Sequence, residues 1–364
     1  MRRTQGALVV LLGALVAFFA LWPVPIDPVA WTAPPSPGYS GPFALNERLA
    51  KLERLPIGPN HGPEAIALDD AGRIYASTRE GRIVRLRPDG SGAETWAETG
   101  GAPLGLHFDA GGNLIVADAM RGLLRVAPDG RVSVLAAEAD GVPIAYADDL
   151  DIARDGHIYF SDASTKFGAR QWGGSYSASL LEITEHRGHG RLLVWDPATG
   201  KATTLARDVH FANGVALAAD DSYVLVSETA SYRVLRYWLS GPRRGSMEPV
   251  IENLPGFPDN VTRGLGGRFW VALISPRSAP VDALAGRPFL RKVLMRLPGT
   301  LLPQPRDYGH VVAFDGTGKV VASLQDPSGA YRKISSALET ASDLYIGSLE
   351  MPELGRLAKD RAGL

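Results

Sequence analysis

Oxygen-bearing side chains recur at one position of a segment that the chain repeats six times. Four of the six residues at this position carry a carboxylate or an amide, and Asn260 directly follows one of them. The six residues, in chain order, are Glu64, Leu104, Asp148, Asn213, Asp259 and Ser335. Carboxylate and amide oxygens are the ligands of hard divalent cations. A carboxylate among them could also act as a nucleophile or a general base.

The repeat is defined by three further positions that stay in phase with the first. An apolar residue follows two positions later, at Ile66, Leu106, Leu150, Val215, Val261 and Ala337. Six positions further comes a residue that tolerates a turn, at Gly72, Gly112, Gly156, Asp221, Gly267 and Asp343. Three positions beyond it lies a strand residue, at Tyr75, Ile115, Tyr159, Val224, Trp270 and Ile346.

These copies predict an all-β fold, a six-bladed β-propeller over residues 43–364. The spacing between copies starts at about 40 residues, the length of a four-stranded blade, and grows where insertions intervene. The 41 glycines and 27 prolines suit short strands joined by turns. We expect a strand within residues 42–57 to complete one blade. A two-sheet sandwich is the alternative, but it would not require six equivalent copies.

In a propeller, equivalent residues lie on a ring around the central axis, so the three carboxylates of the ring would repel one another. A Ca²⁺ ion removes that repulsion, and its flexible coordination accepts six to eight oxygens. Zinc is disfavoured because the chain has no cysteine and the ring has no histidine. The alternative is that each acid caps a turn or binds backbone amides. His61 and His210 lie three residues before ring residues and could overhang the channel or simply lie at the surface.

Two insertions interrupt the repeat, at residues 166–190 and 279–302. Long loops of this kind are often lids over a binding face, although they could equally pack as decoration on the rim.

The N-terminus predicts attachment to a membrane. Arg2 and Arg3 precede an apolar run that extends from Ala7 to Trp22 without a clear cleavage pattern. We expect residues 1–26 to be a retained transmembrane signal anchor, a single pass with the propeller on the extracytoplasmic side. A cleaved signal peptide is the alternative. Residues 27–42 are rich in proline and are expected to be a stiff linker that holds the propeller away from the membrane.

Composition excludes several other classes. The net charge is −1, which argues against a nucleic-acid partner. The absence of cysteine excludes disulfides, thiolate metal sites and cysteine nucleophiles. No Gly-x-Ser-x-Gly sequence stands at a strand-to-helix turn, which argues against the serine of an α/β-hydrolase.

At these residues the chain resembles the strictosidine synthase-like branch of the six-bladed calcium propellers, whose wider kin include paraoxonases, gluconolactonase and regucalcin, and diisopropyl fluorophosphatase. Within this branch it resembles the adipocyte plasma membrane-associated proteins, which also combine an N-terminal anchor with the propeller. The matching strings are residues 62–66 (GPEAI), 103–106 (PLGL), 148–152 (DDLDI), 158–162 (IYFSD), 211–215 (FANGV), 254–260 (LPGFPDN) and 344–349 (LYIGSL). The resemblance implies a catalytic calcium held by Glu64, Asp148, Asn213, Asp259 and Asn260.

The chain also departs from this family. Asp148 stands where the family usually has asparagine, which makes the ring more anionic. Ser335 stands where strictosidine synthases place their essential glutamate, and the histidine dyad of the paraoxonases is missing near Leu104 and residues 118–119.

The resulting functional prediction is a calcium-dependent hydrolase of small-molecule esters or lactones. Calcium would polarise the carbonyl group, and Asp259 would act as nucleophile or base, or else as a ligand only. A non-catalytic, membrane-tethered binding propeller with structural calcium is the first alternative. A condensing enzyme of the strictosidine synthase type is the second.

Overall fold

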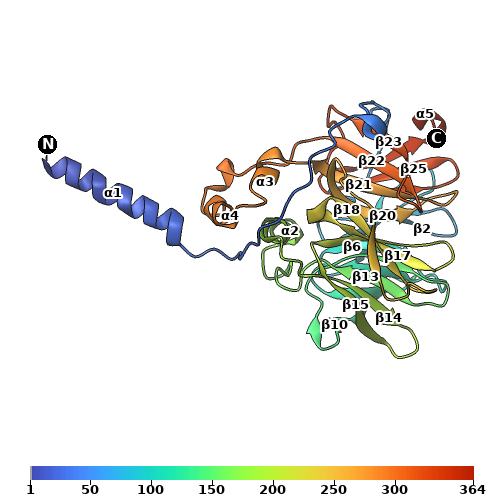
Figure 1. Ribbon diagram of the computed structural model, residues 1–364. Helices are drawn as coiled ribbons and strands as arrows, with labels where there is room; N and C mark the ends of the chain where they lie inside the picture. Colours follow the sequence, from blue (N-terminus) through green and yellow to red (C-terminus); the bar gives the residue numbers. More distant parts are fainter. Residues whose placement is uncertain (1) are drawn as a thin grey trace.

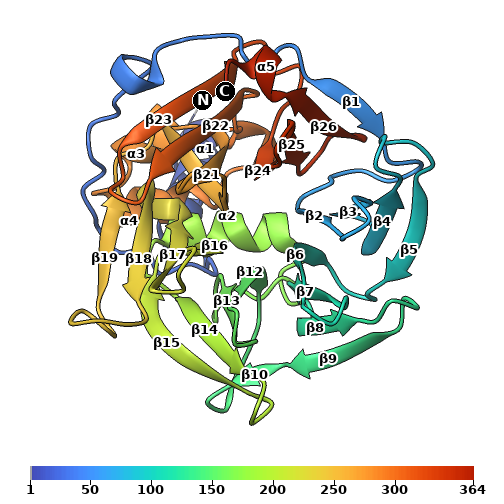
Figure 2. The ribbon, with the colours of Figure 1, turned by 90° about the vertical axis from the view of Figure 1, so that its right-hand side faces the viewer.

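Six antiparallel sheets surround a central axis in the computed structural model, which describes residues 2–364 (Figure 2). The predicted six-bladed propeller is therefore confirmed. The first three blades contain β2 (Ile66–Leu68), β3 (Ile74–Ser77), β4 (Arg82–Leu86) and β5 (Glu94–Glu98); β6 (Pro103–Phe108), β7 (Leu114–Asp118), β8 (Gly122–Val126) and β9 (Val132–Ala136); and β12 (Ala147–Ile152), β13 (Ile158–Asp162), β14 (Gly190–Asp196) and β15 (Lys201–Val209), extended by β10 (Glu138–Ala139) and β11 (Val142–Pro143).

The last three blades follow the same order. They contain β16 (Ala212–Leu217), β17 (Tyr223–Glu228), β18 (Arg233–Trp238) and β19 (Met247–Ile251); β20 (Gly256–Arg263), β21 (Arg268–Pro276), β22 (Gly309–Asp315) and β23 (Val320–Asp326); and β24 (Ile334–Glu339), β25 (Asp343–Ser348) and β26 (Glu353–Ala358) with β1 (Glu53–Pro56). The helical elements are α1 (Arg2–Leu21), α2 (Ser175–Glu185), α3 (Ala279–Ala283), α4 (Pro288–Leu294) and α5 (Lys359–Ala362), with 3₁₀ turns at Gly41–Phe43, Thr229–Ser231 and Gly299–Leu301.

The strand register shows why the repeat stays in phase. In every blade the apolar residue of the repeat is paired across to the second strand of its sheet. These pairs are Ile66 with Ala76, Leu106 with Val116, Leu150 with Phe160, Val215 with Val226, Val261 with Val271 and Ala337 with Ile346. All twelve residues are buried, so a register slip of one residue in any blade would turn core residues to the wrong face.

The ring of blades is closed by the N-terminal strand, as expected from the sequence. Strand β1 pairs antiparallel with β26, where Leu55 lies opposite Leu354. This pairing joins the two ends of the propeller and buries the edge that β26 would otherwise expose.

Helix α1 extends away from the propeller on the side that carries α2, α3 and α4 (Figure 1). The sequence predicts a helix that continues to residue 26. The helix instead ends at Leu21. Of the helices in the described residues, none is long and apolar enough to cross a membrane.

Residues 27–42 differ from the expected spacer because they run along the propeller and bond to it. Val29 N donates to Glu185 O (3.2 Å), and Trp31 N donates to Ala285 O (3.2 Å). Further along, Asn253 Nδ2 donates to Pro35 O (2.9 Å). The two long insertions supply these partners in the first two cases, so the segment packs against α2 and the α3 region.

We expect the closing strand to contribute strongly to stability. Leu55 is 4% exposed and packs in a cluster with Ile57 and Leu354. Leu55→Ala should lower the free energy of unfolding by about 2–5 kcal/mol, because a cavity remains in a packed core. Chemical denaturation of the full chain in detergent measures it. Leu45→Ala, at a side chain that is 65% exposed, is the control and should change stability by less than about 0.5 kcal/mol. Equal effects of the two changes would contradict this role of β1.

Candidate metal and catalytic site

A β-bulge in the innermost strand holds five of the six ring residues, and the exception is Glu64, which directly precedes β2. Strand register shifts between Pro103 and Leu106, and the same shift occurs at the equivalent place in four other blades. Those four shifts lie at Ala147/Leu150, Ala212/Val215, Pro258/Val261 and Ile334/Ala337. Each shift encloses the ring residue and the residue after it. Bulges of this kind re-aim side chains, and five in phase turn five ring positions in the same sense.

The polar ring residues are buried together around the axis. Glu64, Asp148, Asn213 and Asp259 are between 2% and 9% exposed, and Asn260 is 1% exposed. Burial raises the pKa of Glu64 well above its usual value, and the charges of Asp148 and Asp259 raise it further. Burial and the charge of Asp259 likewise raise the pKa of Asp148. The structure therefore brings the three predicted carboxylates within electrostatic reach of one another.

The pKa of Asp259 is raised as well. Burial raises its pKa to about 7, and a hydrogen bond from Asn213 opposes the rise. A carboxyl with a pKa near neutrality exchanges its proton readily under physiological conditions, as a general acid or base must.

Several polar atoms of the ring are buried without a hydrogen-bond partner. They are Oδ1 of Asp148, Oδ1 of Asn213, and both Oδ1 and Nδ2 of Asn260. Buried acceptors without partners are costly, and three such oxygens around one axis form a donor set that suits a hard cation. Within residues 2–364, however, no group of three or more histidine, aspartate or glutamate side chains is arranged to hold a metal ion. The amide oxygens would therefore have to complete the coordination.

Asp149 and Asp151, which the sequence analysis did not single out, hold neighbouring blades together. Val215 N donates to Asp149 Oδ2 (2.9 Å), and Leu217 N donates to Asp151 Oδ2 (2.8 Å). Both carboxylates therefore accept backbone hydrogen bonds from the innermost strand of the fourth blade. The run of acids in residues 148–151 was the sequence signal for these contacts, because a single strand cannot direct all of its acids toward the central axis.

The sixth blade contributes hydroxyl groups instead of an acid. Ser335 Oγ donates to Glu64 O (2.8 Å), and Ser336 Oγ donates to the same carbonyl (2.5 Å). These bonds fix Glu64, the ring residue of the first blade, to the last blade. Ser335 is thus used to position Glu64.

The two candidate histidines pair with carboxylates outside the ring. His61 is exposed and its Nδ1 lies 3.1 Å from Glu80 Oε1. His210 Nδ1 lies 3.0 Å from Glu228 Oε1, and its ring stacks on His186 at 4.3 Å. Neither contact involves a ring residue.

Apolar residues cover the ring on the side of α1. Tyr146 Oη donates to Ser175 O, the first residue of α2 (3.0 Å). Burial raises the pKa of Tyr146 well above its usual value, and the charges of Asp148, Glu64 and Asp259 add to the rise. Tyr146 therefore lies between the carboxylates and α2, which crosses the axis behind the sheets in Figure 2.

Solved structures share this architecture, which defines the class of the fold as a six-bladed β-propeller. A gluconolactonase from Xanthomonas campestris superposes with a TM-score of 0.62 at 20% identity, covering 90% of this chain and 98% of that one. The calcium-binding protein regucalcin from Agrobacterium tumefaciens superposes with a TM-score of 0.56 at 15% identity, covering 82% and 92%. At this identity the likeness shows the fold alone.

Sequence comparison narrows the class to a family. The family description "Strictosidine synthase" matches residues 148–242, and "Strictosidine synthase-like, N-terminal" matches residues 41–86. Adipocyte plasma membrane-associated protein from Bos taurus is 34% identical over 95% of this chain and 87% of its own length. Strictosidine synthase-like protein 10 from Arabidopsis thaliana is 37% identical over 81% and 84%. The chain therefore belongs to the strictosidine synthase-like family, which includes the adipocyte plasma membrane-associated proteins.

The buried carboxylates predict a pH dependence of stability when divalent cations are removed. The pKa of Asp259 is about 7 in the folded chain and near 4 in an unfolded one, so the folded chain binds more protons between these values. Stability is then lost as the pH rises through this interval. In chelator, we expect the melting temperature to fall between about pH 5 and pH 8 and excess calcium to restore it.

Two variants separate this effect from general charge effects. Asp259→Asn should flatten the pH dependence in chelator, whereas Asp70→Asn, at an exposed carboxyl, should leave it unchanged. A melting temperature that does not vary with pH in chelator would show that the ring carboxylates are not strained by burial.

Proposed function

We propose that the ring binds calcium and that the site hydrolyses a small-molecule ester or lactone. The observation that carries the proposal is the cluster of buried carboxyl groups with raised pKa, beside three amide and carboxylate oxygens that lack hydrogen-bond partners. Uncompensated, such a cluster costs folding free energy, and a divalent cation is the simplest compensation. Relatives in fold include a gluconolactonase and a calcium-binding regucalcin, which supports both parts of the proposal.

Each ring residue has a role in this proposal. Glu64, Asp148, Asn213 and Asn260 would hold the cation, which when bound supplies Lewis-acid polarisation of the substrate carbonyl. Asp259 would attack the carbonyl carbon or take a proton from the attacking water. Its pKa of about 7 suits proton transfer, and the Asn213 amide that donates to it would fix its orientation. Ser335 and Ser336 hold the backbone of Glu64 in place.

A non-catalytic binding propeller with structural calcium is the second candidate. It is favoured by one observation, the apolar cover that α2 and Tyr146 form over the ring. A strictosidine synthase-type condensation has less support, because Ser335 and its neighbour are already bonded to Glu64 and the sixth blade supplies no acid to the ring.

Asp259→Asn distinguishes a chemical role from ligation. The amide can still coordinate a cation but cannot attack a carbonyl or accept a proton. We expect kcat on aryl acetates and lactones to fall by at least ~100-fold in saturating calcium. Asp155→Asn, at an exposed turn, is the control and should keep full activity.

Other outcomes assign the site differently. Full activity of Asp259→Asn in saturating calcium would leave Asp259 a ligand only. A wild-type chain that binds calcium but hydrolyses none of these substrates would support the binding propeller instead.

We also propose that α1 attaches the propeller to a membrane. Its exposed apolar side chains include Leu8, Val9, Val10, Leu11, Leu12, Leu15 and Val16. A contiguous apolar surface of this size marks an interaction site, and the relatives are named plasma membrane-associated proteins. The orientation expected from Arg2 and Arg3 stays a prediction.

Charge introduced into α1 tests this attachment. The double change Leu11→Asp with Leu15→Asp should move most of the full-length protein from the membrane fraction to the supernatant, because two charges oppose insertion into lipid. The matched control is Leu265→Asp with Val321→Asp, at exposed apolar residues of the propeller, and it should not change the distribution. Carbonate extraction of the parent chain then separates a spanning helix, which resists, from a surface-bound one. A chain that is soluble without the changes would refute the attachment.

A further inference from the structure

Helix α2 covers one end of the ring. Ala178 and Leu181 on its inner face are buried in one cluster with Leu104, Tyr146 and Phe211. Leu104 is itself a ring residue, and Tyr146 lies next to the carboxylates. A ligand that approaches the ring from the side of α1 therefore meets α2 first and needs the helix to move.

The N-terminal end of α2 has the backbone freedom that such a movement requires. Gly173 and Gly174 precede the helix with φ values of 79° and 118°, and a Cβ atom built on either would meet nothing within 4 Å. No side chain caps the first turn. Two adjacent glycines in open space form a permissive hinge.

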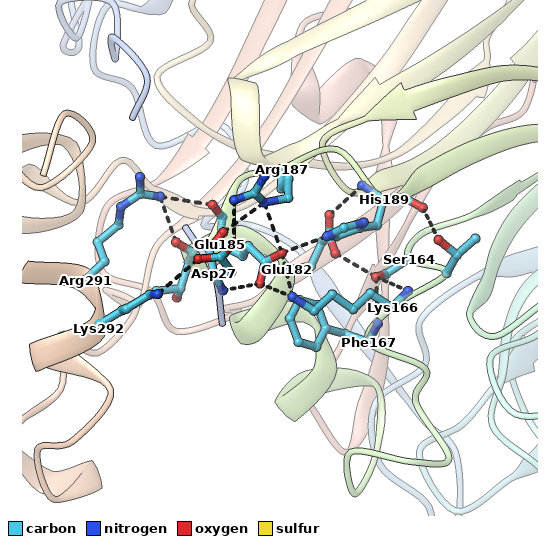
Figure 3. Close-up of polar contacts among 12 residues, drawn as sticks. Asp27, Ser164, Lys166, Phe167, Glu182, Glu185, Arg187, His189, Arg291 and Lys292 are labelled. Atoms are coloured by element: carbon cyan, nitrogen blue, oxygen red, sulfur yellow. Dashed lines mark hydrogen bonds and ion pairs between the residues drawn. The ribbon is translucent and has the colours of Figure 1, made fainter. Parts of the chain in front are cut away.

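The C-terminal end of α2 is instead held by a dense set of polar contacts, centred on the fully buried side chain of Glu185 (Figure 3). Lys166 Nζ lies 2.5 Å from Oε2 and His189 Nε2 lies 2.8 Å from Oε1, both from the third blade. Burial would raise the pKa of Glu185, but these bonds and the amide of Asp27 hold it at about 2. The group is therefore charged and firmly bonded at neutral pH.

Part of this set of polar contacts around Glu185 comes from the segment that follows α1. We define residues 24–35 as the strap. Asp27 N donates to Glu185 Oε2 (2.7 Å), and Ile26 is 2% exposed in the same apolar cluster as the inner face of α2. Trp31 stacks on His186, the residue after α2, at 4.0 Å.

The strap also ties α2 to the second insertion. Arg291 of α4 donates to Thr184 O (2.8 Å) and to the carbonyl of Val29. Lys292 of α4 pairs with the Asp27 carboxylate at 3.0 Å, and Arg187 pairs with it at 2.7 Å (Figure 3). The strap thus lies between the two insertions and bonds to both.

We propose that the strap is a latch that holds α2 closed over the ring, so that release of the strap opens the channel on the side of α1. The strap begins three residues after α1 ends, and Arg296 donates to the carbonyls of Phe19 and Trp22. A change in the position of α1 is therefore transmitted directly to the latch. The latch rests on the proposed function only in taking the ring as the place where a ligand binds.

A single introduced thiol measures the opening. The chain has no cysteine, so Ala178→Cys places one reactive group on the buried face of α2. Its reaction with a maleimide in the full-length protein reports how often α2 separates from the ring. We expect Ile26→Ala to raise the labelling rate at least tenfold, because it removes the apolar contact of the strap. Asp27→Ala should raise it less, since the pairs of Asp27 are partly exposed. Thr32→Ala, at an exposed strap residue, is the matched control and should not raise it.

A second thiol distinguishes local opening from loss of the fold. Ala313→Cys is fully buried in the fifth blade, and its labelling should stay slow in every strap variant. Equal acceleration at both thiols, or no acceleration at residue 178, would overturn the latch. If Ala178→Cys does not fold, hydrogen exchange of the α2 amides in the cysteine-free chain, with and without Ile26→Ala, provides the same comparison.

The activity assay separates this proposal from the proposed function. If the parent chain hydrolyses an ester, Ile26→Ala should raise kcat/KM for bulky substrates more than for acetates, and an unchanged ratio would count against the latch. If no variant hydrolyses any ester while labelling at residue 178 still accelerates, the hydrolase proposal fails and the latch stands.

Discussion

The mutual repulsion of three buried carboxylates is the constraint on which the rest of this structure depends. Desolvation and like charge both favour protonation of Glu64 and Asp148, and desolvation alone raises the pKa of Asp259 to about 7. A core that contains such a ring keeps its shape only if the blades around it are fastened to one another. The bonds from Ser335 to Glu64, from Val215 to Asp149 and from Thr229 to Pro258 do this, because each crosses from one blade to the next at the axis.

The fold could be predicted from the sequence because every blade repeats the same pattern of turn residues and buried apolar residues. A turn residue at a fixed distance from a buried apolar residue determines a hairpin, and six hairpins in phase determine the ring. The ring positions could be located for the same reason. The role of Asp149 could not be assigned, because it depends on a hydrogen bond from Val215 of the next blade, and the sequence does not show which backbone groups meet between blades. The strap was missed for another reason: its contacts are with insertions that belong to no repeat.

The contacts of the strap show that the proline-rich segment is not a free spacer. Proline-rich sequences favour extended backbone, and extended backbone suits a spacer as well as a strand-like segment that lies on a surface. Ile26 and Trp31 favour the segment that lies on a surface, because a free spacer would leave these apolar side chains in water. Both instead pack on α2 or the residue that follows it. The proposed membrane attachment and the proposed latch would therefore be connected through one short segment, which a globular fragment lacking that segment would not reproduce.

Charged and uncharged residues alternate around the ring. The carboxylates come from the first, third and fifth blades, and the blades between them supply Leu104, Asn213 and Ser335. On a six-membered ring this alternation places like charges as far apart as possible, which lowers their repulsion without removing it. It also explains why no three acidic side chains in the described residues stand ready as a metal site. Asn213 belongs to the blade between those of Asp148 and Asp259, and its Oδ1 and that of Asn260 are buried without hydrogen-bond partners. A cation bound here would accordingly be held by amides as well as carboxylates, while Leu104 packs with Ala178 and Leu181 of α2.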